Sequence, residues 1–288
     1  MQRRRFNGVE DLAAMQELVA ERTEAMGVGS NLHPGDVAHR IYSGLRRERL
    51  DDVVLVWMEA DRLEAFALLW PKYQAFDVVT SRDLDDEALR TVVTEAVEAA
   101  EGKGRVETDL IGDDHRLRTV LEDLGFTWFE DGYVFTAQQI PALSISGAVE
   151  VNAGDFEVRS VTRDDAAALA EVHARSFGSS WTTSEYETLM SSPGYIAENE
   201  LVVVDSDGTF AGFTVTWNDR RNRIGYFEPV GVHENFRRQG VGSLLLAEGV
   251  RRMQAAGMTH ATVWHDASDE RSGAFYAANG FERVSLVT

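Results

Sequence analysis

The chain has 288 residues, of which 44% are hydrophobic and 26% charged, with a formal net charge of −20 and no cysteine. This length suffices for two domains with separate cores, and the composition is that of a soluble globular protein. The lack of cysteine excludes disulfides and thiolate chemistry and fits a cytoplasmic location. The acidic charge argues against nucleic acid as a partner, and no apolar run reaches the ~18 residues of a membrane helix.

Hydrophobic periodicity predicts alternating helices and strands in the first half of the chain. Apolar residues recur at helical spacing in some segments, whereas others are short apolar runs between turn residues. The predicted helices are Asp11–Met26, Asp86–Glu101 and His115–Leu124, and the predicted strands are Val53–Met58, Ala65–Trp70, Arg105–Leu110 and Thr127–Phe135.

The second half repeats this order of elements. The predicted strands are Phe156–Val161, Leu201–Val204, Phe210–Trp217, Arg223–Val232, Thr259–His265 and Phe281–Val287, and the helices are Arg163–Arg175, Ser243–Ala256 and Glu270–Asn279. Single residues also match between the halves: Arg5 and Asp11 correspond to Arg159 and Asp165. We therefore expect two tandem domains, 1–138 and 155–288, joined by a linker at 139–154 that is rich in Pro, Ser, Gly and Ala.

A loop rich in arginine and glycine follows the predicted strand Arg223–Val232. Its residues Arg237, Gly240 and Gly242 have the spacing R-x-x-G-x-G directly before a predicted helix. Glycines let main-chain N–H groups approach a phosphate closely, and a helix N-terminus attracts anions. The surrounding segment, residues 219–238, has more arginines than acidic residues in an otherwise acidic chain. The pattern therefore predicts a diphosphate cradle.

The cradle and a later segment together resemble one enzyme family. The loop does not fit the nucleoside-triphosphate or G-x-G-x-x-G fingerprints. Val232, Arg237, Gly240 and Gly242 match the V-x-x-x-x-R-x-x-G-x-G motif of the GNAT superfamily of N-acetyltransferases, and Asp269–Phe281 resembles the family's N-x-x-A-x-x-x-Y-x-x-x-G-F motif. The layout is similar to that of mycothiol synthase, which also pairs two such domains.

This resemblance implies an α/β fold of two tandem GNAT-like domains, each a mixed, mostly antiparallel sheet flanked by helices. It implies acetyl-CoA as acyl donor, bound by the C-terminal domain. The positions that it assigns to acetyl-CoA are Val230, Gly231, Val232, Arg237, Arg238, Gln239, Gly240, Val241, Gly242, Ser243 and Asp269.

The resemblance also implies catalytic roles. In the family, a main-chain N–H on the strand before the cradle polarises the thioester carbonyl. Gly231 in this strand indicates a bulge or a close approach of the main chain, or else a glycine packed beneath an aromatic ring. Tyr276 matches the family tyrosine that protonates the departing thiolate, a task that suits a phenol of pKa near 10.

The general base is less clearly marked. Glu228 is the first candidate, and strand alternation predicts that it shares a face with Val230 and Val232. The family glutamate often lies two residues earlier, where this chain has Tyr226. His265 is a second candidate.

Some residues have two interpretations. Asp269 replaces the family asparagine, so it either accepts hydrogen bonds from the cofactor or acts as the N-cap of the following helix. The aromatic residues Trp181, Tyr186 and Tyr195 line an acceptor pocket or belong to the core. The scattered histidines have no metal-ligand spacing, so we expect no metal site.

The first half lacks the motifs. At the position of the cradle it has Ser81–Glu87, which contains no glycine and is rich in carboxylates, and Leu121 stands opposite Tyr276. We therefore expect a degenerate N-terminal domain and an N-acetyltransferase acting on a primary amine, more readily of a small molecule than of a protein. The alternative is a non-catalytic acyl-CoA sensor or scaffold, and the chain is expected to be a monomer or homodimer.

Overall fold

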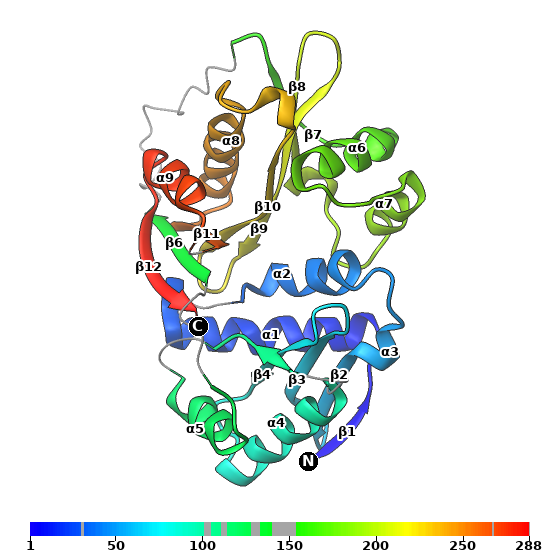
Figure 1. The fold of residues 1–288 in the computed structure, drawn as a ribbon, viewed down its shortest axis with the longest axis vertical. Helices are drawn as coiled ribbons and strands as arrows, with labels where there is room; N and C mark the ends of the chain where they lie inside the picture. Colours follow the sequence, from blue (N-terminus) through cyan, green and yellow to red (C-terminus); the bar gives the residue numbers. More distant parts are fainter. Residues whose placement is uncertain are drawn as a thin grey trace. The chain divides into compact units, whose positions relative to one another are not determined.

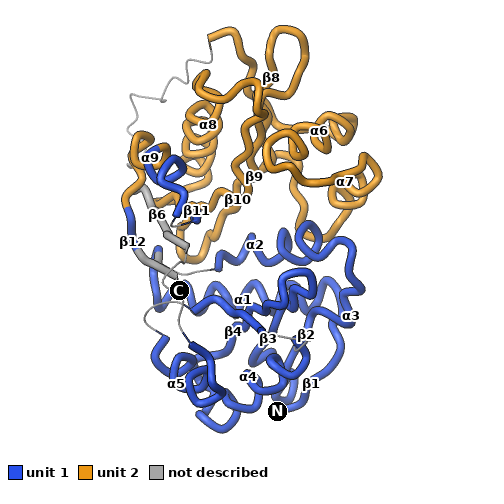
Figure 2. The backbone as a smooth tube through the Cα atoms, viewed as in Figure 1, with its two compact units in different colours: residues 1–135, 264–274, 283–288 blue, residues 136–263, 275–282 orange. Residues whose placement is uncertain are grey.

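The computed structural model describes residues 1–29, 32–100, 105–110, 114–127, 133–139, 154–266 and 268–287. Within it the chain forms two compact units (Figure 2). The first contains Met1–Phe135, Trp264–Ala274 and Arg283–Thr288, and the second contains Thr136–Val263 and Phe275–Glu282. Most of the expected linker, residues 140–153, lies outside the described residues, so the boundaries of the two expected domains stay a prediction.

The first unit contains a five-stranded sheet in the order β1-β2-β3-β4-β5 (Figure 1). Its strands β1 to β4 are antiparallel, and β4 pairs with β5 in parallel. The strands are β1 (Gln2–Arg5), β2 (Val54–Glu59), β3 (Arg62–Trp70), β4 (Ala75–Thr80) and β5 (Glu107–Thr108). The helices are α1 (Val9–Met26), α2 (Pro34–His39), α3 (Leu50–Val53), α4 (Asp86–Ala100) and α5 (His115–Asp123), with a π-helical turn at Arg40–Gly44 and a 3₁₀ turn at Gly27–Gly29.

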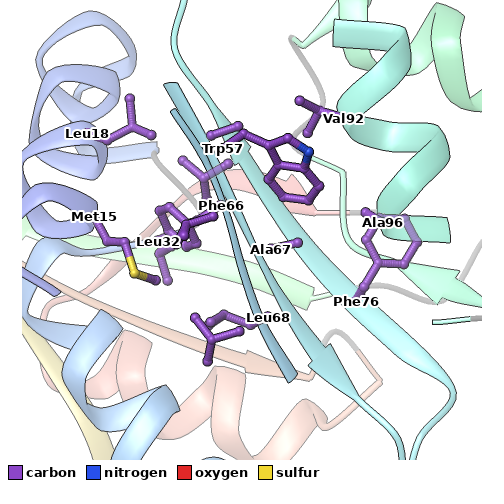
Figure 3. Close-up of a cluster of buried hydrophobic side chains, with 14 of the residues drawn as sticks. Met15, Leu18, Leu32, Trp57, Phe66, Ala67, Leu68, Phe76, Val92 and Ala96 are labelled. Carbon is purple, nitrogen blue, oxygen red and sulfur yellow. The ribbon is translucent and has the colours of Figure 1, made fainter. Parts of the chain in front are cut away.

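Helices cover both faces of this sheet, as its burial pattern requires. In Figure 3, Met15 and Leu18 of α1 lie on one side of the strands, and Val92 and Ala96 of α4 lie on the other. The central strand β3 is apolar at nearly every position and buried on both faces. Such a strand is stable only between two layers of helices, because alternate side chains point to opposite faces.

The second sheet has seven strands in the order β12-β6-β11-β10-β9-β8-β7. Strands β7 to β10 are antiparallel, and β10 pairs with β11 in parallel. The strands are β6 (Tyr133–Gln139), β7 (Glu157–Ser160), β8 (Glu200–Val204), β9 (Phe210–Asp219), β10 (Ile224–Val232), β11 (His260–Asp266) and β12 (Glu282–Val287). The helices are α6 (Ala166–Phe177), α7 (Thr183–Met190), α8 (Val241–Ala255) and α9 (Glu270–Ala278), with 3₁₀ turns at Arg163–Asp165, Ala197–Asn199 and Glu234–Phe236.

Two neighbouring residues of β9 show how the helices flank this sheet (Figure 1). A Cβ atom on Gly212 would meet Val241 of α8, at 2.7 Å. The next residue, Phe213, contacts Phe177 of α6, with ring centroids 6.0 Å apart. Since consecutive side chains of a strand point to opposite faces, α6 and α8 pack on opposite faces of the sheet.

The same ion pair occurs at the start of both halves. Arg4 Nη1 donates to Asp11 Oδ2 (2.6 Å), and Arg159 Nη1 donates to Asp165 Oδ2 (2.8 Å). Each aspartate also accepts a main-chain N–H near the start of the first helix of its half. The shared device supports a duplicated module, although the pairing arginine of the first half is Arg4, where the sequence comparison aligned Arg5.

The predicted fold class, an α/β protein with two mixed, mostly antiparallel sheets flanked by helices, is confirmed. One strand was assigned to the wrong sheet: β6, which shares residues 133–135 with the predicted strand Thr127–Phe135, lies between β11 and β12 in the seven-stranded sheet. The sequence also gave no prediction for α2 or β4, and it left the segment of α7 as loop or helix.

Candidate functional site

Strands β10 and β11 are paired over only part of their length. The ladder runs from Ile224↔His260 to Tyr226↔Thr262. Strand β10 continues to Val232 and β11 to Asp266, without further ladder pairs between them. The two strands therefore diverge after Tyr226. Main-chain groups of the Val230–Val232 segment along this edge are available to an extended ligand, because a strand edge without a ladder partner offers N–H and C=O groups in a row.

A β-bulge lies where the strands diverge. Phe227 pairs with Thr216 of β9, and Val230 pairs with Thr214, so one extra residue is inserted in β10. Trp217 and Thr214 of β9 hold the bulge through side-chain hydrogen bonds. Trp217 Nε1 donates to the Glu228 carbonyl (2.9 Å), and Thr214 Oγ1 donates to that of Pro229 (2.8 Å).

The bulge overturns one expectation about the candidate base. Because of the inserted residue, Val230 lies on the same face as Phe227, and both pack in one apolar cluster. The prediction that Glu228 shares the face of Val230 is therefore wrong. Glu228 is half-buried at the bulge and is followed by a cis peptide to Pro229. The sequence analysis associated a bulge with Gly231 and overlooked Pro229, although a proline inside a strand is a recognised sign of one.

The loop between β10 and α8 has the backbone of an anion cradle. Arg238 and Gly240 have positive φ angles of 62° and 85°. No side chain caps α8, and its first main-chain hydrogen bond runs from the Leu244 N–H to the Gly240 carbonyl (3.0 Å). The N–H groups of the first turn are the orphan donors of a helix N-terminus, and they attract an anion.

Side chains hold the cradle loop in shape and leave its positive charge exposed. The Gln239 amide donates to the Asn235 carbonyl (2.9 Å), and His233 Nδ1 accepts the Asn235 N–H (3.1 Å). Arg237 Nη2 donates to the Ser176 carbonyl at the end of α6 (3.1 Å). Arg237 and Arg238 are both exposed. The loop therefore combines a fixed backbone with cationic side chains at the surface.

Gly242 links the cradle helix to the helix of Tyr276. A Cβ atom on Gly242 would lie 2.9 Å from the Phe275 ring. Tyr276, the next residue, is 7% exposed and belongs to the same cluster as Phe227 and Val230 of β10. The second unit thus brings together the cradle, the bulged strand and the tyrosine that the sequence singled out.

Gly231 lies beneath aromatic rings. A Cβ atom there would be 2.4 Å from Phe213 Cε1 and 3.1 Å from Phe177 Cε2. Of the interpretations left open by the sequence, packing beneath an aromatic ring is the one observed. The bulge itself begins a few residues earlier in the strand.

We expect Gly231→Ala to lower the free energy of unfolding by about 1–3 kcal/mol, because overpacking forces the rings to move. Denaturant titration measures this. Gly273→Ala is the matched control: its Cβ would have only ordinary contacts with His265, the nearest at 3.4 Å, inside helix α9. Equal stability of the two variants would contradict the packing account of Gly231.

Two candidate site residues from the sequence analysis, Asp269 and His265, lie in the first of the two compact units. Asp269 Oδ1 accepts the Arg271 N–H (3.1 Å), and Oδ2 accepts from the Ser272 hydroxyl (2.7 Å). The Ser272 hydroxyl and main-chain hydrogen bonds lower the pKa of the Asp269 carboxyl. These contacts are those of an N-cap. His265 Nδ1 lies 2.8 Å from the Asp266 carbonyl oxygen.

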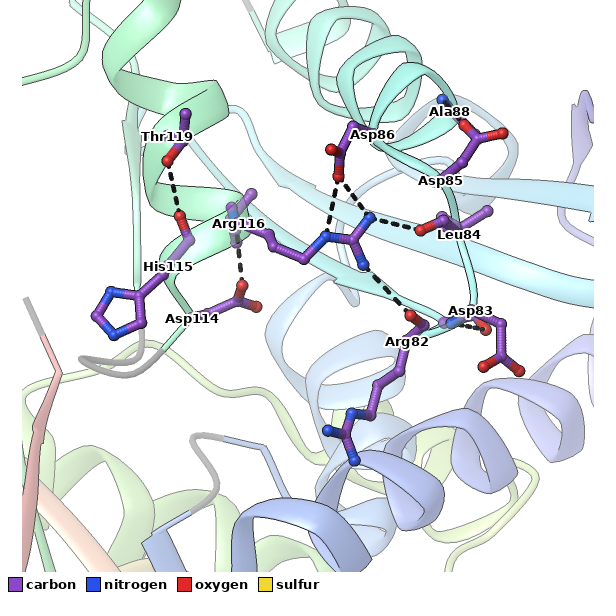
Figure 4. Close-up of polar contacts among 12 residues, drawn as sticks. Arg82, Asp83, Leu84, Asp85, Asp86, Ala88, Asp114, His115, Arg116 and Thr119 are labelled. Atoms are coloured by element: carbon purple, nitrogen blue, oxygen red, sulfur yellow. Dashed lines mark hydrogen bonds and ion pairs between the residues drawn. The ribbon is translucent and has the colours of Figure 1, made fainter.

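The loop before α4 is the counterpart of the cradle in the first unit, and it is closed (Figure 4). Asp85 Oδ1 accepts the Ala88 N–H (2.8 Å), so a carboxylate already occupies this helix N-terminus. Arg116 of α5 donates to the carbonyls of Leu84 and Arg82 and to the Asp86 carboxylate. A carboxylate cap and an arginine clamp stand where α8 has uncapped N–H groups.

Tyr186 and Tyr195 belong to a polar cluster and not to an open pocket. Both hydroxyls donate to the carboxylate of Glu200, which is 1% exposed. Burial raises the pKa of Glu200, and the two tyrosine hydrogen bonds oppose this rise. The core interpretation is correct for Tyr186, which is 2% exposed, and Tyr195 is half-buried beside it. Among the described residues, no cluster of His, Asp or Glu has the arrangement of a metal site.

None of the helices in the described part of the chain is long and apolar enough to cross a membrane.

Comparison with known proteins points to one family. Residues 166–281 match the model of the acetyltransferase (GNAT) family. No curated protein matches the chain significantly.

Solved structures resemble nearly the whole chain. A GCN5-related N-acetyltransferase from Sphaerobacter thermophilus is 18% identical with a TM-score of 0.63, and the match covers 99% of this chain and 93% of that one. A tandem GNAT protein from the clavulanic acid biosynthesis pathway is 14% identical (TM-score 0.63; 99% and 96% covered). A GNAT-family acetyltransferase from Colwellia psychrerythraea is 10% identical (TM-score 0.62; 100% and 98% covered). At these identities the likeness shows a shared fold.

Proposed function

We propose that this protein, whose residues 166–281 match the model of the acetyltransferase (GNAT) family, transfers an acetyl group from acetyl-CoA directly to a primary amine of a small molecule. The observation that carries the proposal is the uncapped N-terminus of α8 beside the diverging strands β10 and β11. Acetyl transfer needs a diphosphate anchor and a free strand edge for the donor. The second unit of this protein contains both.

The residues present fit the donor. The diphosphate of acetyl-CoA would lie against the first-turn N–H groups of α8, next to Arg237 and Arg238, because both backbone and side chains there favour an anion. The amide groups of its pantetheine arm would pair with the free edge of β10 between Val230 and Val232. The assignment of Val230, Gly231, Gln239, Val241 and Ser243 to the donor rests on the same argument.

The proposed reaction has a simple balance. The amine nitrogen attacks the thioester carbonyl, a C–N bond forms and the C–S bond breaks. A main-chain N–H of the Val230–Val232 segment stabilises the developing oxyanion. Glu228 accepts the proton that the amine loses, and Tyr276 protonates the thiolate that leaves. The acetyl group passes directly between substrates, so no acyl-enzyme forms.

We propose that the first unit binds no acetyl-CoA. Asp85 occupies the N-terminus of α4, and its negative charge would repel a diphosphate. The Arg116 clamp on the Leu84 carbonyl would have to break before the loop could open. The expected stoichiometry is therefore one acetyl-CoA per chain.

Calorimetry with acetyl-CoA tests the cradle. We expect Gly240→Asp to weaken binding at least about 100-fold, since a carboxylate would stand among the donors meant for phosphate. Gly257→Asp is the matched control, because Gly257 has nearly the same φ (86° against 85°), open space for a Cβ and a place at the other end of α8. The structure favours this single variant over one that includes Gly242, whose side chain would collide with Phe275.

Each outcome of that titration is informative. One site that Gly257→Asp retains and Gly240→Asp loses supports the proposed cradle and justifies a screen of amines. Two sites per chain would contradict the closed loop of the first unit. No binding in the wild-type protein would refute the acetyltransferase proposal.

A further inference from the structure

An aromatic cluster joins the core of the second unit to its surface. It consists of His173 and Phe177 of α6, Trp181 between α6 and α7, and Phe213 of β9. The His173 ring lies 5.1 Å from Phe177, 5.2 Å from Trp181 and 5.2 Å from Phe213, between ring centroids. Phe213 is wholly buried, whereas Phe177 is 49% exposed. The cluster therefore presents aromatic surface to solvent on a rigid base.

This surface adjoins the strand on which the acetyl carbonyl is expected. Phe177 Cε2 lies 3.1 Å from the position of a Cβ on Gly231. The residue before it, Ser176, accepts the hydrogen bond from Arg237 of the cradle (3.1 Å). Phe177 thus lies beside β10 on the face covered by α6, close to the cradle loop.

The orientation of His173 is fixed by Ser179. His173 Nδ1 lies 2.7 Å from the Ser179 hydroxyl oxygen. The same hydroxyl lies 3.4 Å from the main-chain carbonyl oxygen of His173. Through this contact Ser179 holds the imidazole among the aromatic rings. The ring adds a polar group to an otherwise apolar wall.

The two carboxylates beside the cluster already have a cationic partner. Glu171 of α6 and Glu234 of the cradle loop both pair with Arg175, at 4.0 Å and 3.2 Å. A second ammonium of the acceptor would compete with this arginine for its carboxylates. Aromatic rings instead attract one cation through their faces and bury a flat apolar group against their edges.

We propose that His173, Phe177 and Trp181 form the acceptor subsite and select arylalkylamines, that is, primary amines joined by a short chain to an aromatic ring. This inference rests on the proposed acetyltransferase function. The aryl group packs on Phe177 and Trp181, and the ammonium group lies toward His173 and β10. These residues act in specificity and positioning, and the chemistry remains with the residues of β10 and α9.

Steady-state kinetics with a matched pair of amines tests the inference. CoA release is read with a thiol reagent, to which a chain without cysteine adds no background. We expect kcat/KM for phenethylamine to exceed that for butylamine at least tenfold. Phe177→Ala should raise KM for phenethylamine at least tenfold and leave the affinity for acetyl-CoA unchanged. Ile196→Ala, which truncates another half-exposed apolar residue of the unit (50% exposed), should change neither.

A second readout needs no turnover. Saturation-transfer NMR should detect phenethylamine on the wild-type protein and on Ile196→Ala but not on Phe177→Ala. Acetylation of amines without the aryl preference, or a preference that survives Phe177→Ala, would overturn the subsite while leaving the proposed function intact. Failure to bind acetyl-CoA would instead refute the proposed function, and the NMR comparison would still decide whether the aromatic surface binds the amine.

Discussion

Replacing Tyr276 by phenylalanine is expected to lower kcat by about 10²- to 10⁴-fold, the range typical of a lost general acid. The ring would keep its place in the apolar cluster, with Phe275 and Phe281 at centroid distances of 5.1 Å and 5.8 Å. Affinity for acetyl-CoA should not change, because the cradle is formed by α8 and its loop. Loss of the hydroxyl should cost at most about one hydrogen bond, roughly 1 kcal/mol of stability.

The measurement compares single-turnover rates with calorimetric affinity for the donor. Tyr195→Phe is the control, since it removes a tyrosine hydroxyl from the same unit, the one that donates to Glu200 (2.6 Å). This control should retain wild-type turnover. A protein that binds acetyl-CoA but has no turnover to lose would be the non-catalytic sensor, and full activity of Tyr276→Phe would exclude the acid role.

The elements around the cradle could be predicted because their sequence signals are local. The helix after the cradle was predicted to end at Ala256, and α8 ends at Ala255, with the next glycine, Gly257, at a positive φ of 86°. Gly240 was expected to allow close approach of an anion, and it is the N-cap of α8. Helix ends and tight turns depend on a few neighbouring residues, so the pattern of glycines is sufficient to locate them.

Other features depended on partners far away in the sequence. The face on which Glu228 lies is set by Trp217 and Thr214, which hold the bulge from the neighbouring strand. The alternation of a strand predicts its faces only while the register is regular. The aromatic cluster likewise joins Phe213 to α6 across a long stretch of chain. Similarly, the alternation of apolar residues does not indicate which sheet a strand joins. For that reason β6 was assigned to the wrong sheet.

Strand β4 escaped prediction in part because it carries a charged residue, Asp77, whose partners are distant. Asp77 Oδ2 accepts from Arg40 Nη1 (2.8 Å) and from Trp70 Nε1 (2.9 Å). The parallel pairing of β4 with β5 ends at Phe76↔Thr108, so Asp77 and Asp109 follow on adjacent strands. The first unit therefore holds two half-buried carboxylates close together.

Replacing the Asp109 carboxylate by a neutral amide is expected to stabilise the protein in a pH-dependent manner. Burial, and then the charge of Asp77, raise the pKa of Asp109 from 3.8 to about 6, against the opposing effect of Arg40. The folded state therefore binds this proton more tightly than the unfolded state. The stability that Asp109 contributes is present below the unfolded pKa and is lost as the pH rises through the folded pKa. At neutral pH the ionised carboxylate costs up to about 3 kcal/mol.

Asp109→Asn removes this cost, so its stabilising effect should be larger at pH 7.5 than at pH 4.5 by about 2 kcal/mol. Denaturant titration at both pH values, followed by tryptophan fluorescence, measures the difference. Asp51→Asn, at an exposed position of the same unit, should show no such dependence. An equal effect of Asp109→Asn at both pH values would mean that the amide changes packing and not charge. Destabilisation confined to pH 7.5 would mean that Arg40 depends on the Asp109 carboxylate as well as on Asp77, and the raised pKa would then be wrong.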